Sequence, residues 1–233
     1  MNVGILETGR PPEALEARFG RYDAMFGRLL GPDYVTRTYD VRAGDYPDLP
    51  EDHEAYIVTG SAAGVYDDLP WIEPLKGFLR QAKGRAKLVG ICFGHQIMAE
   101  AFGGQVEKSN NGWGIGLHCY DVWEKAPWMD DVERFSVPVS HQDQIVCPPP
   151  AARIVAASPF TAYGVLAYED QPAISFQCHP EFEPGFAEAL IESRRERLPD
   201  PDAAIETLQT PSDRQMVGSW IRRFLNGSAA ADS

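Results

Sequence analysis

The chain has 233 residues, enough for one large α/β domain or two small ones with a substantial core. Its net charge is −13, from 21 Lys and Arg against 34 Asp and Glu, and no basic stretch suited to nucleic acid is present. No segment approaches the roughly 20 apolar residues of a membrane span, and the start lacks a signal-peptide pattern. Four cysteines without paired spacing indicate a reduced, cytoplasmic protein, with no nucleic-acid or membrane partner.

The first half of the chain alternates between strand and helix patterns. Residues 2–7 are apolar on both faces, which is typical of a central parallel strand. Residues 13–30 have helical apolar spacing that Gly31-Pro32 stops. Further strands are predicted at residues 34–41, 55–59 and 87–91, and further helices at 70–82 and 96–102. This order predicts a mostly parallel sheet covered by helices.

The second half is richer in short strands, which predict an antiparallel extension of the sheet. These strands are expected at residues 114–123, 133–140, 153–157, 161–169 and 173–177. A helix is expected at 184–197, and an amphipathic helix at 210–225 with Thr210 as its N-cap. The apolar stripe of this last helix suits burial better than docking to a partner. No linker divides the chain, so residues 1–233 are predicted to form a single domain.

A cysteine lies where the fourth predicted strand turns into a helix. Gly90 and Gly94 flank Cys92 two residues away on each side, as a sharp strand-to-helix turn requires. Such a turn exposes the thiol at a helix N-terminus, where the dipole favours a thiolate nucleophile. The pattern alone fits a small buried cysteine equally well. The adjacent His95-Gln96, and two His-x-acid pairs later in the chain, favour the nucleophile.

A thiolate nucleophile needs a base, and the base needs an acceptor that orients it. His179 and Glu181 flank Pro180, which favours an extended backbone and so directs both side chains to the same side. His141 and Asp143 have the same spacing, and from spacing alone they are nearly as good a pair. Either pair also fits a loop histidine that is hydrogen-bonded to its neighbour.

Metal and phosphate sites have weaker support. Cys92, His95 and the Cys178-His179 pair lack the Cys-x-x-Cys or His-x3-His spacing of structural zinc sites. The phosphate-loop motif G-x-x-x-x-G-K-[ST] does not occur in the sequence. We therefore expect neither a metal nor a cofactor.

Several segments that follow one another along the chain carry a family resemblance. They are residues 59–61 with 65–67, residues 90–96, residues 140–143 and residues 178–182. Together they resemble the motifs of class I (triad) glutamine amidotransferases. The layout is similar to the glutaminase domain of GMP synthases, and closer still to stand-alone relatives such as the plant γ-glutamyl peptidases. The resemblance implies a three-layer, flavodoxin-like α/β fold with a mostly parallel central sheet and an antiparallel extension.

The resemblance also implies catalytic roles. Cys92 would be the nucleophile, His179 the general base and acid, and Glu181 the residue that orients the histidine. Backbone N–H groups of Gly60 and Phe93 would form the oxyanion hole. The implied reaction is attack of the cysteine on a γ-glutamyl amide, loss of ammonia or an amine, and hydrolysis of a γ-glutamyl thioester.

Further positions match the family's substrate pocket. Gln96 matches a residue that helps to hold glutamine, and Ser140 and His141 lie nearby in that pocket. One departure concerns the loop after Gly60-Ser61, where Ala62-Ala63 stands instead of the proline that family members often carry. The course of this loop is therefore not implied by the resemblance.

Two versions of the function compete. One is an independent enzyme that cleaves a small-molecule γ-glutamyl substrate, and the other is a glutaminase subunit that delivers ammonia to a separate synthase. We expect no synthase domain after the triad, because only about 50 residues follow it. A non-catalytic, redox-sensing member of the fold is a third interpretation. It is less favoured, because a sensor needs neither His179 nor Glu181.

Overall fold

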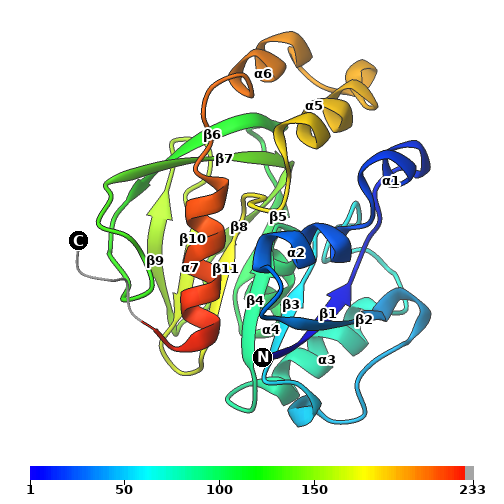
Figure 1. The fold of residues 1–233 in the computed structure, drawn as a ribbon, viewed down its shortest axis with the longest axis vertical. Helices are drawn as coiled ribbons and strands as arrows, with labels where there is room; N and C mark the ends of the chain where they lie inside the picture. The colour runs from blue at the N-terminus through cyan, green and yellow to red at the C-terminus, as the bar shows by residue number, and fades with distance from the viewer. Residues whose placement is uncertain (229–233) are drawn as a thin grey trace.

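The computed structural model describes residues 1–228, and its central feature is a nine-stranded mixed sheet (Figure 1). The strand order is β2-β1-β3-β4-β11-β10-β9-β6-β7, with parallel pairs from β2 to β11 and antiparallel pairs from β11 to β7. The parallel strands are β1 (Asn2–Glu7), β2 (Val35–Asp40), β3 (Ala55–Val58), β4 (Lys87–Ile91) and β11 (Ala173–Phe176). The others are β6 (Gly114–Val122), β7 (Arg134–His141), β9 (Ala152–Ala157) and β10 (Val165–Tyr168). The predicted α/β class, with a mostly parallel sheet and an antiparallel extension, is confirmed.

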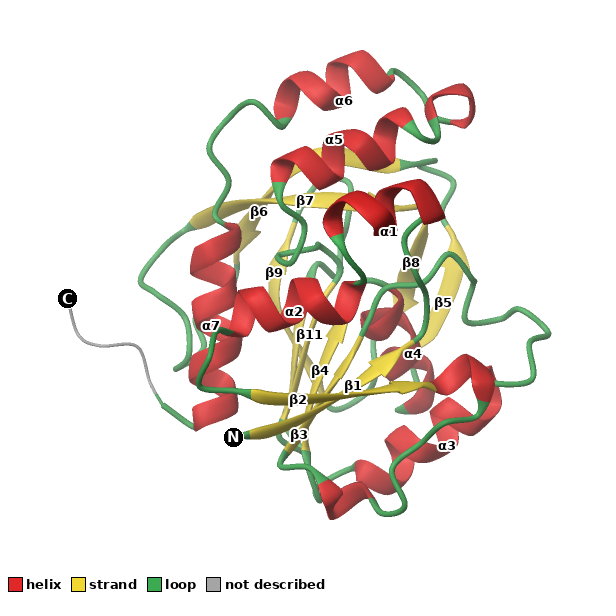
Figure 2. Ribbon diagram, turned by 45° about the vertical axis from the view of Figure 1, so that its right-hand side comes forward, coloured by secondary structure: helices red, strands yellow, loops and turns green. Residues whose placement is uncertain are grey.

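Helices cover both faces of the sheet and make three layers (Figure 2). One face carries α2 (Tyr22–Leu30) and α7 (Arg214–Asn226), and the other carries α3 (Ile72–Ala82) and α4 (Phe93–Ala101). The remaining helices are α1 (Glu13–Phe19), α5 (Pro184–Glu192) and α6 (Pro201–Thr207), of which α5 and α6 lie against β6. Because both halves of the chain contribute to one sheet, we propose that the chain forms the single predicted domain; residues 229–233 lie outside the described residues.

The last helix buries its predicted apolar stripe but begins later than predicted. Its fully buried large side chains are Val217, Trp220, Ile221 and Leu225. Thr210 is not the N-cap, since its hydroxyl donates to the carbonyl oxygen of Thr207 at 2.7 Å. Asp213 instead exchanges two hydrogen bonds of 2.7 Å with the backbone of Ser136 on β7. These bonds fix the residue before Arg214, and the helix starts there.

The single helix predicted over residues 13–30 is two helices, α1 and α2. Gly20 has a φ of +85°, a conformation that favours glycine, and it ends α1. The next residue, Arg21, is extended, and its guanidinium lies 2.7 Å from the buried carboxylate of Glu7. This tertiary contact fixes the start of α2 as a separate helix.

Some elements escaped the sequence analysis. A separate two-stranded sheet pairs β5 (Gln105–Lys108) with β8 (Asp143–Cys147). The helix predicted at 184–197 ends at Glu192, and α6 starts beyond it, where the Asp200 carboxylate accepts a hydrogen bond from the N–H of Ala203 at 3.2 Å. Short 3₁₀ turns occupy Val41–Ala43, Pro50–Asp52 and Arg195–Arg197. Each helix within residues 1–228 is too short or too polar to span a bilayer.

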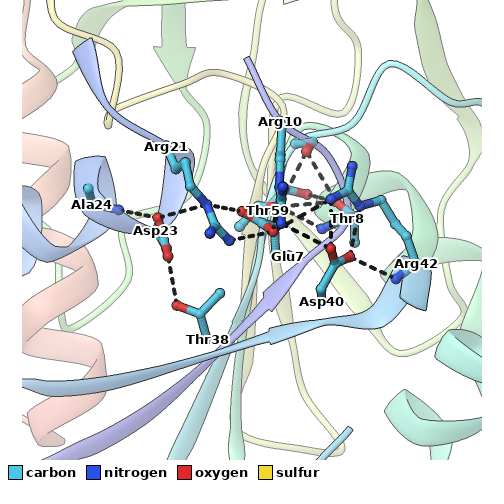
Figure 3. Close-up of polar contacts among 11 residues, drawn as sticks. Glu7, Thr8, Arg10, Arg21, Asp23, Ala24, Thr38, Asp40, Arg42 and Thr59 are labelled. Carbon is cyan, nitrogen blue, oxygen red and sulfur yellow. Dashed lines mark hydrogen bonds and ion pairs between the residues drawn. The ribbon is translucent and has the colours of Figure 1, made fainter. Parts of the chain in front are cut away.

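A buried carboxylate lies at the end of β1 (Figure 3). Glu7 is completely buried and accepts hydrogen bonds from Arg21 at 2.7 Å and Arg10 at 3.2 Å. Asp40, at the end of β2, pairs with Arg10 and with Arg42. A buried charge is tolerated only when it is paired and hydrogen-bonded in this way. The cluster therefore ties the ends of β1 and β2 to the start of α2.

We expect Glu7→Gln to lower the free energy of unfolding by about 2 kcal/mol, because neutral hydrogen bonds replace charge-assisted ones in a buried site. Urea unfolding followed by circular dichroism measures this difference. Glu13→Gln is the matched control, since Glu13 is exposed at the start of α1. Equal losses in the two variants would contradict a stabilising role for the buried cluster.

Candidate active site

The predicted catalytic residues lie in loops that follow neighbouring strands at one edge of the sheet. The adjacent parallel strands β1, β3, β4 and β11 are level with one another in the ladder, so their carboxyl ends lie side by side. Soon after these ends come Thr8, Gly60, Cys92 and His179. In open α/β sheets, ligands bind at this edge.

Cys92 lies on a strained turn between β4 and α4. Its φ of 54° and ψ of −104° are a conformation that few residues other than glycine adopt. A Cβ on Gly90 would lie 2.5 Å from the carbonyl oxygen of Gly94, and a Cβ on Gly94 would lie 2.2 Å from that of Val58. Only glycine fits at both positions, which explains the Gly-x-Cys-x-Gly pattern. Since α4 begins at Phe93, the thiol is at the N-terminus of a helix.

The segment after β11 brings a histidine and a carboxylate together. The Nδ1 of His179 lies 2.7 Å from Oε1 of Glu181, and both side chains are buried. The ring of Phe182 stacks on the imidazole, with centroids 3.9 Å apart and planes 5° apart. With Nδ1 occupied by Glu181, Nε2 is the ring nitrogen left free. His179 and Cys92 line the same small pocket, so the structure places the three predicted catalytic residues close together.

Two other elements anchor the backbone of this segment. The N–H of His179 donates to the carbonyl oxygen of Pro138 on β7 at 2.8 Å. Arg214, the first residue of α7, donates from Nε to the carbonyl oxygen of Pro180 at 3.2 Å. The position of the imidazole is thus set by the sheet and by the last helix together.

The charges around His179 determine its protonation. Burial lowers the pKa of this imidazole, but the negative charges of Glu181 and Cys92 outweigh burial and raise the pKa to about 10. A raised pKa favours the imidazolium form of this ring at neutral pH. Oε2 of Glu181 has no hydrogen-bond partner among residues 1–228, so the imidazole is the main contact of this carboxylate.

The second His-x-acid pair does not form the same contact. The Nδ1 of His141 lies 3.1 Å from the backbone oxygen of Asp143 and not from its carboxylate. Burial lowers the pKa of His141 to about 3, so this ring is neutral. Spacing alone made the two pairs nearly equal, and tertiary contacts separate them.

His95, in the first turn of α4, has a structural role. His95 is completely buried, with Nδ1 at 2.7 Å from the hydroxyl of Ser175 and Nε2 at 2.9 Å from the carbonyl oxygen of Tyr163. Burial lowers its pKa to about 3. Among the described residues, no group of three or more potential metal ligands includes this ring.

Two backbone N–H groups lie where an oxyanion hole was predicted. The N–H of Phe93 is in the first turn of α4, where N–H groups have no acceptor within the helix. The N–H of Gly60 meets no acceptor within residues 1–228. A Cβ on Gly60 would lie 3.0 Å from Cε1 of His179 and 3.9 Å from Cβ of Cys92, so Gly60 packs directly over the reactive pair.

A cavity of about 420 Å³ opens beside Cys92. The residues predicted to bind substrate all line it: Gln96, Ser140 and His141. Gln96 uses both hydrogens of its amide within the protein, donating to the backbone oxygen of Asp143 at 2.8 Å and to Oε1 of Gln177 at 3.1 Å. Only the side-chain oxygen of Gln96 is therefore available to a ligand.

Charged residues that the sequence analysis did not assign to the substrate pocket also line this cavity. The cations are Lys108, Arg194 and Arg197, and the carboxylates are Asp67 and Asp143. Arg194 is held by a hydrogen bond of 3.3 Å to the hydroxyl of Ser140. Lining of both signs suits a zwitterionic ligand. No motif marks Arg194 and Arg197, which fall inside a predicted helix and reach the cavity only through the fold.

Comparison with known families decides the classification. The family model of glutamine amidotransferase class I matches residues 47–194, which is more than half of the chain. The chain belongs to the class I glutamine amidotransferase family. The matched range includes every predicted site residue, from Gly60 to Glu181. It leaves out β1 and α7, although Thr8, which follows β1, and Arg214 of α7 contact the segments that form the site.

Relatives of this amidotransferase include peptidases and synthases. Gamma-glutamyl peptidase 2 of Arabidopsis thaliana is 31% identical over 73% of this chain and 71% of its own length. A glutamine-hydrolyzing GMP synthase of Thermus thermophilus is 32% identical over 55% of this chain and 24% of its own length. The crystal structure of a glutamine amidotransferase from Thermotoga maritima has the same fold, with a TM-score of 0.76 and 20% identity over 97% of this chain and 98% of that chain.

Proposed function

We propose that this class I amidotransferase hydrolyses a γ-glutamyl amide, either glutamine or a γ-glutamyl compound, with Cys92, His179 and Glu181 as its catalytic triad. One observation carries the proposal. An imidazole oriented by a buried carboxylate at 2.7 Å lines the same small pocket as a cysteine on a strained elbow at a helix N-terminus. Nucleophile, base and orienting group in this order are what covalent acyl transfer requires.

The reaction would begin with attack of the Cys92 thiolate on the γ-carbonyl carbon. The N–H groups of Gly60 and Phe93 would donate to the oxyanion of the tetrahedral intermediate. The His179 imidazolium would give its proton to the departing nitrogen, which breaks the C–N bond and releases ammonia or an amine. A γ-glutamyl thioester remains. Water, losing a proton to His179, would then attack the thioester, release glutamate and restore the thiolate.

The cavity supports the recognition of a γ-glutamyl group as a small-molecule substrate. Such a group carries an α-amine and an α-carboxylate, and the cavity offers carboxylates for the first and arginines for the second. The side-chain oxygen of Gln96 adds an acceptor close to Cys92. Ser140 and a neutral His141 complete the predicted binding set. A cytoplasmic location and the absence of a nucleic-acid partner stay predictions from composition.

A second candidate function is a glutaminase subunit that passes ammonia to a separate synthase. The glutamine-hydrolyzing GMP synthase relative supports it, since this chain spans 24% of that protein's length. Its chemistry at Cys92 would be the same. The two candidates differ in whether the isolated chain hydrolyses its substrate. Amidotransferase subunits are commonly inactive until a partner orders the oxyanion loop, which here is the loop that begins at Gly60.

We expect the purified chain alone to hydrolyse a γ-glutamyl amide at a steady rate. The measurement is a screen of glutamine and assorted γ-glutamyl amides, with glutamate release as the readout. Cys92→Ala is the matched control for contaminating activity. If the chain binds these substrates but turns over only when a synthase subunit is added, the stand-alone function is wrong and the ammonia-donor function replaces it.

A further inference from the structure

Side chains continue the pairing of β1 with β3 beyond its last backbone hydrogen bond. That last bond runs from the N–H of Thr59 to the carbonyl oxygen of Leu6 at 3.2 Å. One step further, the N–H of Thr8 donates to Oγ1 of Thr59 at 3.0 Å, and the hydroxyl of Thr8 donates to the carbonyl oxygen of Thr59 at 2.9 Å. Both threonines are completely buried. Figure 3 shows them beside Glu7 and its arginines.

We propose that Thr8 is a positioning residue for the oxyanion hole, acting through the peptide unit that joins Thr59 to Gly60. The inference rests on the proposed function, in which the N–H of Gly60 binds the oxyanion. The carbonyl that accepts the Thr8 hydrogen bond and the N–H of Gly60 belong to this one peptide unit. Because a trans peptide is planar, its C=O and N–H point in opposite directions. Fixing the carbonyl toward Thr8 therefore fixes the N–H away from it.

The hydrogen bonds at this contact favour one orientation of the peptide. A threonine hydroxyl has a single hydrogen. The carbonyl oxygen of Thr59, at 2.9 Å, is nearer to the Thr8 hydroxyl than Oγ1 of Thr59 or the carbonyl oxygen of Gly60, both at 3.1 Å. A hydrogen bond at a carbonyl also polarises the amide and strengthens its N–H as a donor. A flipped peptide would lose this bond and would present a carbonyl oxygen where the oxyanion needs a donor.

The residue after Thr8 closes the space into which the oxyanion loop could move. A Cβ on Gly9 would lie 2.8 Å from the carbonyl oxygen of Gly60 and 2.9 Å from Cα of Ser61. The backbone of Gly9 thus packs directly on that loop. The buried Glu7, bonded to Arg10 and Arg21, holds the start of the same segment in place. The fold itself thereby supplies the order that a partner would otherwise have to impose on the loop.

The hydroxyl is tested by two substitutions at one position. Thr8→Val removes it and keeps the shape, whereas Thr8→Ser retains it. With γ-glutamyl-p-nitroanilide as the probe, we expect Thr8→Val to lower kcat about 10²-fold and to leave KM within about twofold, as loss of one oxyanion donor does. Thr8→Ser should keep most of the wild-type kcat. Alkylation of Cys92 by iodoacetamide, which forms no oxyanion, should proceed at the wild-type rate in both variants.

A second measurement needs no substrate. In ¹H–¹⁵N NMR spectra, the Gly60 amide should shift and exchange its hydrogen faster in Thr8→Val, and should stay near its wild-type position in Thr8→Ser. If the wild-type chain hydrolyses no γ-glutamyl amide but Gly60 responds in this way, the proposed function fails and the positioning contact is supported. An unchanged Gly60 amide in Thr8→Val, or a wild-type kcat in that variant, would overturn the role of Thr8.

Discussion

The His179→Ala variant should hydrolyse a γ-glutamyl amide about 10⁴-fold more slowly than the wild type, as loss of a nucleophile's base typically does. His179 bonds Glu181 at 2.7 Å and lines the same small pocket as Cys92. Its removal takes away the cation that favours the thiolate and the acid that protonates the leaving nitrogen. Steady-state kcat is the measurement, with Cys92→Ala defining the background rate.

His141→Ala is the matched control for this prediction, because His141 also has an acid two residues further on. Its Nδ1 bonds the backbone oxygen of Asp143, and burial keeps the ring neutral by lowering its pKa to about 3. We therefore expect this variant chiefly to raise KM, since the ring lines the substrate cavity. An inactive His141 variant beside an active His179 variant would refute the assignment of the base.

A glutamine-mimicking electrophile, such as a diazo-ketone analogue, should modify Cys92 alone and abolish activity. The modified cysteine would then not be the one most accessible to solvent. Cys92 is buried, whereas Cys119 and Cys147 are exposed. Cys178 should stay unmodified because burial raises the pKa of its thiol far above the usual range. Reaction at Cys92 must therefore come from the elbow and from His179, and not from exposure to solvent.

Peptide mass spectrometry after labelling measures this selectivity, and Cys92→Ala is expected to be both unlabelled and inactive. Labelling spread evenly over the cysteines, with activity intact, would contradict covalent catalysis by Cys92. If peroxide instead oxidised Cys92 in a chain without hydrolytic activity, this result would support the redox-sensing interpretation.

The features that could be predicted from the sequence are those that neighbouring residues determine. Gly90 and Gly94 are required by contacts at the turn that holds Cys92, and the spacing His179-Pro180-Glu181 sets its own geometry. The strands β1, β3 and β4 were likewise predictable, because a strand buried on both faces is apolar throughout. The prediction for residues 173–177 was wrong in one respect: this strand, β11, was expected in the antiparallel extension, but it pairs parallel with β4 in the middle of the sheet. Sequence patterns report such local constraints directly.

Features that depend on distant parts of the chain could not be predicted. The helix at 13–30 divides where Arg21 meets Glu7, a residue in a strand. His141 bonds the backbone oxygen of Asp143 and not its carboxylate, although the spacing matches that of His179 and Glu181. Arg194 reaches the cavity only because the fold places the end of α5 beside Ser140. No periodicity or motif in the sequence predicts these contacts between distant residues.

The place of β11 in the sheet has a consequence for the newly made chain. β11 is the last strand in sequence, yet it lies between β4 and β10. As the chain leaves the ribosome, β4 and Cys92 emerge long before His179, and β4 keeps one unpaired edge until β11 inserts beside it. Pairings between distant segments form late, because the long loop between them must close first. A nascent or incompletely folded chain therefore lacks the arrangement of Cys92 and His179, which forms only once the middle of the sheet is complete.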